Sequence, residues 1–125
     1  MAKALIDTDV IIDLVRGNDA VNGQVNSLLQ ECSLYISTIS VMEILIGARN
    51  KNEVRYWSSI IDMCTPLELN ETIGVVALDL IKNYHHSHGL GIPDALIAAT
   101  ALTEEIVLYT KNVKHFQMIP ELKLY

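Results

Sequence analysis

Three carboxylates stand within apolar stretches of the 125-residue chain. They are Asp7 after Ala-Leu-Ile, Glu43 in Ser-Val-Met-Glu-Ile-Leu-Ile, and Asp94 in Gly-Ile-Pro-Asp-Ala-Leu-Ile. Such surroundings predict burial, and a buried ionised carboxylate must be paired, be hydrogen-bonded, bind a metal or take up a proton. A set of oxygen ligands favours a hard cation such as Mg²⁺ or Mn²⁺ over zinc. The three acids are therefore candidates for a metal-dependent site.

Each acid also has a purely structural explanation. Ser40-x-x-Glu43 matches a helix capping box, Asp7 can cap a helix, and Asp94 falls in a first helical turn where acids are favoured. Their position along the chain favours a functional site over a purely structural role. Asp7 directly follows one predicted strand, Glu43 closely follows the next, and Asn112 follows a third. Parallel strands bring their carboxyl ends to one edge of a sheet, where sites form.

The elements that position these residues follow from hydrophobic periodicity and from capping and turn residues. Strands are predicted at 2–6, 34–37 and 106–109, with a short edge strand at 122–125. Helices are predicted at 10–16, 21–32, 39–48, 54–64, 73–84 and 95–102. The helices at 39–48 and 95–102 are apolar on every side and should be buried. Strands alternating with helices predict an α/β class, with a mostly parallel sheet and helices on both faces.

Composition bounds the class of protein. Half of the chain is apolar, so one globular domain over residues 1–125 is expected. Fifteen acidic residues against nine basic ones give a net charge of -6, which argues against a broad basic surface for nucleic acid. Two distant cysteines indicate neither a disulfide framework nor a zinc site, and no apolar run is long enough to cross a membrane. A cytoplasmic protein without a membrane partner is expected.

Four segments contain the candidate site residues. They are Leu-Ile-Asp-Thr-Asp-Val-Ile-Ile-Asp-Leu at 5–14, Ile-Ser-Val-Met-Glu-Ile-Leu-Ile-Gly-Ala at 39–48, Ile-Pro-Asp-Ala-Leu-Ile-Ala-Ala-Thr-Ala at 92–101, and Tyr-Thr-Lys-Asn-Val-Lys-His-Phe at 109–116. Together these segments resemble the PIN-domain family, and most closely the VapC toxins of toxin–antitoxin pairs. They keep the family's order and spacing over essentially the whole chain.

The resemblance implies a PIN-like domain that acts as an Mg²⁺- or Mn²⁺-dependent endoribonuclease. Asp7, Glu43 and Asp94 match the family's acidic cluster, and Asn112 stands at a fourth position that is often Asp. Asn keeps an oxygen donor but lacks the negative charge of Asp. The number of metal ions that the site would bind, one or two, therefore stays open. Asp9 is a possible additional acid or a helix-start residue. Only the resemblance places Asp94 at the same edge of the sheet as the other acids.

The expected reaction is hydrolysis of RNA phosphodiester bonds. Asp7 and Asp94 would be direct metal ligands, Glu43 would act partly through water, and Glu43 or Asp9 would accept the proton of the attacking water. Four basic residues could contact flanking phosphates, although each taken singly is more simply a solvated charge. They are Arg16, Arg49, Lys111 and Lys114. The resemblance also implies a small cognate antitoxin and a homodimer.

Two other functions remain open at this point. Asp7-Thr8-Asp9-Val10 resembles the nucleophile motif of haloacid-dehalogenase-like phosphatases, although the downstream lysine and acidic pair of that family have no match after Lys111-Asn112. A catalytically inactive PIN-like module could instead bind RNA or a protein. His115 is expected to be a surface or packing residue.

Overall fold

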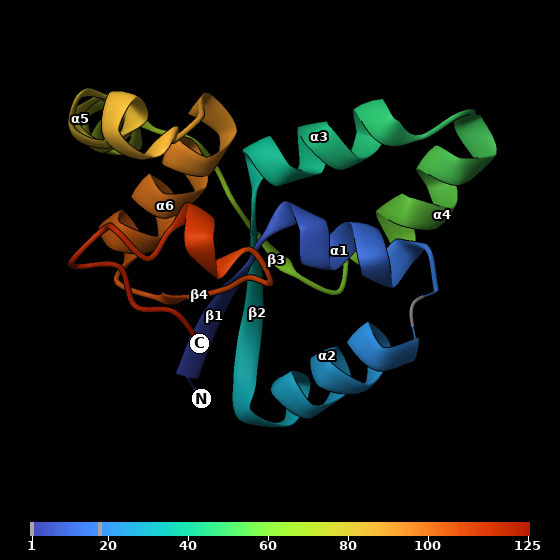
Figure 1. The fold of residues 1–125 in the computed structure, drawn as a ribbon. Helices are drawn as coiled ribbons and strands as arrows, with labels where there is room; N and C mark the ends of the chain where they lie inside the picture. The colour runs from blue at the N-terminus through green and yellow to red at the C-terminus, as the bar shows by residue number, and fades with distance from the viewer. Residues whose placement is uncertain (1, 18) are drawn as a thin grey trace.

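A four-stranded parallel sheet forms the centre of the computed structural model, which describes residues 2–17 and 19–125 (Figure 1). Its strand order is β3-β2-β1-β4. The strands are β1 (Ala2–Ile6), β2 (Cys32–Ser37), β3 (Thr65–Leu67) and β4 (Val107–Tyr109). Leu5 of β1 pairs with Tyr35 of β2 and Leu108 of β4 in parallel registers. The carboxyl ends of β1, β2 and β4 therefore meet at one edge.

Helices cover both faces of this sheet, as the sequence predicts. Figure 1 shows α5 and α6 on one side, and α1, α2 and α4 on the other. The helices are α1 (Thr8–Val15), α2 (Asp19–Glu31), α3 (Thr38–Gly47), α4 (Lys51–Ile61), α5 (Glu71–His88) and α6 (Ile92–Glu104), and a short 3-10 helix follows β4 at Val113–His115. The predicted α/β class is confirmed.

The core has two halves because side chains of a strand alternate between the faces of the sheet. Ala4 and Ile6 of β1 pack with buried residues of α1, α2 and α4, such as Ile11. Leu5 points to the other face and packs with buried residues of α5 and α6, such as Ile73. The predicted burial of the apolar helix at 95–102 is confirmed, since most of its residues lie in this second half.

The predicted burial of the apolar helix at 39–48 is wrong. In α3 the side chain of Ile46 is 84% exposed and that of Met42 46%, whereas Ser40 and Ile44 are buried. Ile39, Val41 and Leu45 are partly buried against the core, whereas Met42 and Ile46 lie on the surface. The proposed capping box at Ser40 is also wrong, because Ser37 caps α3 by accepting a hydrogen bond from the N–H of Ile39.

Two strands differ from the prediction. The strand β3 was not predicted; it is three residues long and contains Pro66, which is tolerated because β3 lies at the edge of the sheet. The predicted edge strand at 122–125 is reduced to one isolated bridge between Leu108 and Leu124. Among the helices that the structure describes, none is both long and apolar enough to span a membrane.

Candidate active site

Asp7 lies where β1 ends and α1 begins. It is the N-cap residue of α1, and its Oδ1 accepts a hydrogen bond of 2.8 Å from the N–H of Thr8. Its Oδ2 accepts a second hydrogen bond of 2.7 Å from the hydroxyl of Thr110, which follows β4. The N–H of Asp7 donates to the carbonyl of Tyr109 at 2.9 Å. Asp7 is thereby fixed at the carboxyl edge of the sheet, with only 3% of the residue exposed.

The surroundings of Asp7 disfavour its negative charge. Burial raises the pKa of Asp7 from 3.8 to about 6, against the lowering effect of the hydrogen bonds from Thr110 and Thr8. The charges of Asp94 and Asp9 raise it further. Asp7 thus carries its charge close to two other acids in a site largely shielded from water. A bound cation is one arrangement that would stabilise this concentration of negative charge.

Asp94 lies in the first turn of α6, directly after Pro93. Burial raises its pKa, the charge of His115 lowers it, and the charge of Asp9 raises it. His115 approaches from the 3-10 helix after β4, with Nδ1 at 3.3 Å from Oδ2 of Asp94. The structure therefore brings Asp94 to the edge where Asp7 lies, a position that the strand order alone did not predict.

Glu43 is held through Thr8. The hydroxyl of Thr8 lies 2.8 Å from Oε1 of Glu43 and 2.8 Å from the hydroxyl of Ser40. A carboxylate oxygen can only accept, so Thr8 is the donor to Glu43. Thr8 and Ser40 are both buried, and Glu43 is half-buried. The carboxylate of Glu43 is thus oriented by a residue directly beside Asp7.

Asn112 and Asp9 contact each other at the same edge. The side-chain amide nitrogen of Asn112 donates a hydrogen bond to Oδ2 of Asp9, and the backbone N–H of Asn112 donates to the hydroxyl of Thr110 at 2.9 Å. The loop after β4 is therefore tied to the first turn of α1. Asp9 is exposed, but its charge acts on both Asp7 and Asp94.

The side chains as placed do not form a closed metal cage. Within residues 2–17 and 19–125, no three His, Cys, Asp or Glu side chains are grouped so that they could hold a metal ion. The donors themselves still fit magnesium, because Mg²⁺ usually keeps several waters and needs only one or two carboxylates besides a substrate phosphate. Asp7 and Asp94 supply two such carboxylates, and the charge of Asp94 is one of the causes that raise the pKa of Asp7.

The four candidate basic residues fall in different places. Lys111 forms an ion pair with Asp13 of α1, and Lys114 is exposed in the 3-10 helix. Arg16 and Arg49 line a surface hollow of about 760 Å³ at the far end of α1. The structure thus separates them into two groups and does not bring all four to the acids.

Four polar residues of the site were missed by sequence reasoning. They are Thr8, Ser40, Thr110 and His115. Thr8 and Thr110 directly follow Asp7 and β4, so a polar residue just after a strand end is a signal that could have found them. His115 was expected to be a surface or packing residue; its side chain is 59% exposed, yet its ring contacts Asp94. Nothing in the sequence marks that contact.

Comparison with known proteins identifies the class. The PIN domain model matches residues 4–121, and the chain belongs to the PIN-domain family. Ribonuclease VapC10 of Mycobacterium tuberculosis is 34% identical over 120 residues, which cover 95% of this chain and 90% of that protein. The predicted resemblance to PIN-domain VapC proteins is confirmed.

Solved structures show the same relationship. A toxin–antitoxin complex from Klebsiella pneumoniae contains a chain with a TM-score of 0.78 and 27% identity, covering 96% of this chain and 95% of that one. VapBC2 from Rickettsia felis, bound to a DNA fragment from its promoter, matches with a TM-score of 0.83 over 98% of this chain and 96% of its own. At 22% identity, that second match supports the fold alone.

Proposed function

We propose that this protein is a metal-dependent endoribonuclease and the toxin of a VapBC-type toxin–antitoxin pair. The observation that carries the proposal is the meeting of Asp7, Asp94 and Asp9 at the carboxyl edge of the sheet, where burial and, in smaller part, the charges of Asp94 and Asp9 raise the pKa of Asp7. Membership of the PIN-domain family and similarity to a protein named as a ribonuclease support the choice of RNA as substrate.

Asp7 and Asp94 are the residues that would hold Mg²⁺ or Mn²⁺, with Glu43 acting through water and Asn112 as a neighbouring oxygen donor. A divalent ion there would lower the pKa of a bound water and offset charge on the phosphate oxygens. Because Thr8 holds Oε1 of Glu43, we assign Oε2 the role of accepting the proton of the attacking water. Asp9 is the second candidate for this role, although Asn112 engages its Oδ2.

The test is cleavage of a structured RNA pool by the purified full chain in Mg²⁺, in Mn²⁺ and in EDTA. Asp94→Asn removes one charge at nearly constant shape, and Asp79→Asn makes the same change at an exposed position on α5. We expect metal-dependent products from the parent and from Asp79→Asn, and none from Asp94→Asn. Equal cleavage by Asp94→Asn would refute the assignment.

The same assay separates the alternative functions. RNA binding without products at any metal concentration, in protein shown by mass spectrometry to be free of antitoxin, would identify an inactive PIN-like module. The phosphatase alternative would require hydrolysis of p-nitrophenyl phosphate. Membership of the PIN-domain family argues against it, as does the engagement of Lys111 by Asp13 on α1.

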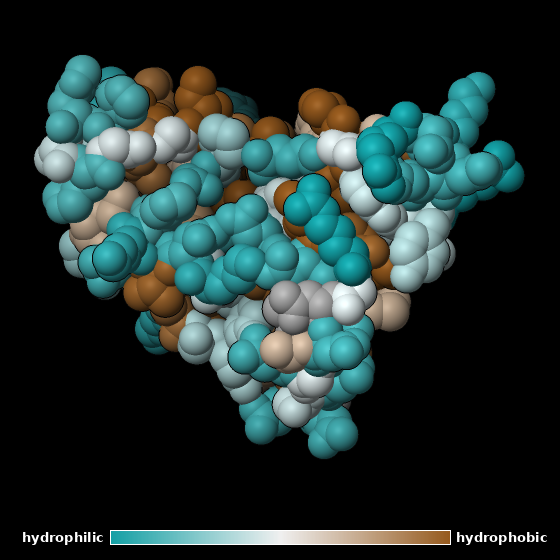
Figure 2. Space-filling model, turned by 45° about the vertical axis from the view of Figure 1, so that its right-hand side comes forward, coloured by the Kyte–Doolittle hydropathy of each residue, from teal (hydrophilic) through white to brown (hydrophobic). Residues whose placement is uncertain are grey.

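We also propose a cytoplasmic protein with two partners, a cognate antitoxin and a second copy of this chain. Exposed apolar side chains support protein partners, and Figure 2 shows hydrophobic surface along the upper edge of the molecule. On α3 and α5 they include Met42, Ile46, Val75 and Leu78. Light scattering after gel filtration, with and without the product of an adjacent short reading frame, tests both partners. A monomer that binds no such product would contradict the proposal.

A further inference from the structure

A surface hollow of about 760 Å³ lies where the end of α1 meets the end of α3 and the start of α4. Its lining includes Arg16, Arg49, Asn50, Asn52 and Tyr56. These groups offer two guanidinium groups, two side-chain amides and an exposed aromatic ring. Figure 2 shows a strongly hydrophilic surface at its upper right, over α4 and the loop before it.

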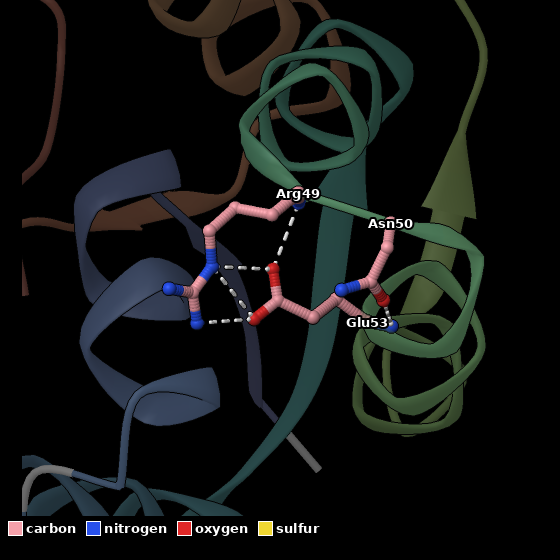
Figure 3. Close-up of polar contacts among 3 residues, drawn as sticks. All are labelled: Arg49, Asn50 and Glu53. Atoms are coloured by element: carbon pink, nitrogen blue, oxygen red, sulfur yellow. Dashed lines mark hydrogen bonds and ion pairs between the residues drawn. The ribbon is translucent and has the colours of Figure 1, made fainter.

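One arginine of the hollow is held in place. Arg49 donates from Nε to both carboxylate oxygens of Glu53, and a terminal nitrogen donates to Oε2 at 2.9 Å. The backbone N–H of Arg49 donates to Oε1 of the same carboxylate at 2.8 Å. Figure 3 shows the Arg49 side chain extending from the loop toward α1, with its guanidinium group beside that helix. The guanidinium plane is therefore oriented before any ligand arrives.

The charges of the hollow sum to a local excess of positive charge. Glu53 neutralises one arginine, and its own pKa is lowered chiefly by its hydrogen bonds from Arg49 and in smaller part by the charge of Arg16. Arg16 remains as the additional cation. The N-terminal end of α4, capped by Asn50, adds the partial positive charge of a helix start. An anionic group is favoured here, although the whole chain carries a net charge of -6.

One face of α1 connects the hollow to the acids. Asp9, Asp13 and Arg16 recur at i, i+4 and i+7 and therefore share that face. Asp9 acts electrostatically on Asp7 and Asp94, and Asp13 pairs with Lys111. The helix rises by about 10 Å between Asp9 and Arg16, which is close to the length of about three stacked nucleotides. An RNA strand whose phosphate lies at the acids can thus reach the hollow.

An aromatic ring completes the set of groups. Tyr56 is 57% exposed, whereas its neighbour Trp57 is buried in the core. Cationic groups along a backbone, combined with an exposed ring on which a base can stack, are the features of single-strand nucleic-acid binding. We propose that this hollow is a subsite for the RNA strand beside the cut, in which Arg16 and Arg49 contact a phosphate and Tyr56 stacks on a base. The inference rests on the proposed ribonuclease function.

The test measures binding without cleavage. Fluorescein-labelled oligouridylates of about 4 and about 12 nucleotides are titrated with the full chain in EDTA, and anisotropy gives the affinity at several salt concentrations. Arg16→Gln removes the uncompensated charge, and Tyr56→Leu removes the ring but keeps an apolar side chain. Lys82→Gln is the matched control, because it removes one exposed charge on α5. Circular dichroism verifies that each variant folds as the parent does.

We expect the parent and Lys82→Gln to bind the longer RNA more tightly than the shorter one. Arg16→Gln should weaken binding of the longer RNA about fivefold and reduce the slope of log affinity against log salt by about 0.7, and Tyr56→Leu should weaken it about tenfold. Unchanged affinity of both variants, or a parent without preference for the longer RNA, would overturn the subsite.

A protein ligand would give a different result. Loss of hexaglutamate binding in Arg16→Gln, with RNA binding unchanged, would assign the hollow to an acidic peptide and refute the RNA subsite. Because binding is measured in EDTA, this outcome is independent of the metal-dependent cleavage that tests the proposed function. A parent that binds RNA in the hollow but cuts none would refute the nuclease and leave the subsite standing.

Discussion

The hydroxyl of Thr8 donates a hydrogen bond of 2.8 Å to Oε1 of Glu43, a residue 35 positions further along the chain. The N–H of Thr8 also donates a hydrogen bond to Oδ1 of Asp7, the N-cap residue of α1. One residue therefore orients two of the acids, through its backbone and through its side chain. The relative position of Asp7 and Glu43 depends on this contact.

Thr8→Val should reduce RNA cleavage by about 10- to 100-fold, because groups that orient metal-site carboxylates contribute about that much. The backbone N–H to Asp7 is kept, so the loss reports on Glu43. Thr8→Ser keeps the hydroxyl and should retain most of the activity. Initial cleavage rates at saturating Mg²⁺ provide the measurement, with Thr72→Val at an exposed position on α5 as control. Activity of Thr8→Val equal to that of Thr8→Ser would contradict the role.

Asp7 should make the metal-free protein less stable as the pH rises. Its pKa is raised from 3.8 to about 6, chiefly by burial, so the folded state binds the proton more tightly than the unfolded state does. This contribution to stability is complete below about pH 4 and is lost as the pH rises through about 6. The rise in pKa corresponds to roughly 3 kcal/mol.

Asp7→Asn should remove this pH dependence and stabilise the protein at neutral pH by up to about 3 kcal/mol in EDTA. Urea unfolding between about pH 4 and about pH 8 gives the free energy of unfolding of both proteins. The difference between parent and variant isolates the contribution of Asp7 from that of other titrating groups. A difference that does not change with pH would show that Asp7 titrates normally.

His115 should hold the pKa of Asp94 below the value that burial alone would produce. Its charge and hydrogen bond both lower that pKa, with Nδ1 at 3.3 Å from the carboxylate. His115→Leu should therefore raise the pKa of Asp94. The pKa is measured in metal-free protein by ¹³C NMR of the Asp94 carboxyl carbon as the pH is varied. His115→Asn keeps an N–H donor near the place of Nδ1 and should raise it less. His86→Leu, exposed at the end of α5, should leave it unchanged.

One glycine within α5 and one directly after it should respond in opposite ways to replacement by alanine. Gly89 ends the helix with φ at +72°, a left-handed conformation that costs other residues about 1 kcal/mol, so Gly89→Ala should destabilise the protein by that amount. Gly74 lies inside the helix with open space where a Cβ would stand. Gly74→Ala should stabilise by about 0.5–1 kcal/mol. Thermal unfolding gives the midpoint temperature of each variant. Midpoints that both rise or both fall relative to the parent would refute this account.

Short-range patterns determined a large part of the fold before any coordinates were considered. The apolar run of β1, the capping position of Asp7 and the burial of the alanine-rich helix α6 all follow from residues within one or two turns of each other. Parallel strand order then placed Asp7 and Glu43 near one sheet edge. These features could be predicted because capping and hydrophobic periodicity are local properties of the chain.

Long-range packing decided the rest. Thr110 donates to Asp7 across 103 residues, and the contact of His115 with Asp94 requires α6 and the 3-10 helix to meet at the edge. The exposure of Ile46 likewise depends on how α3 lies against the core. The sequence by itself determined which residue types could do chemistry and which segments carry them. Only the tertiary structure decided which of them touch, because contacts between distant segments depend on packing that no local pattern records.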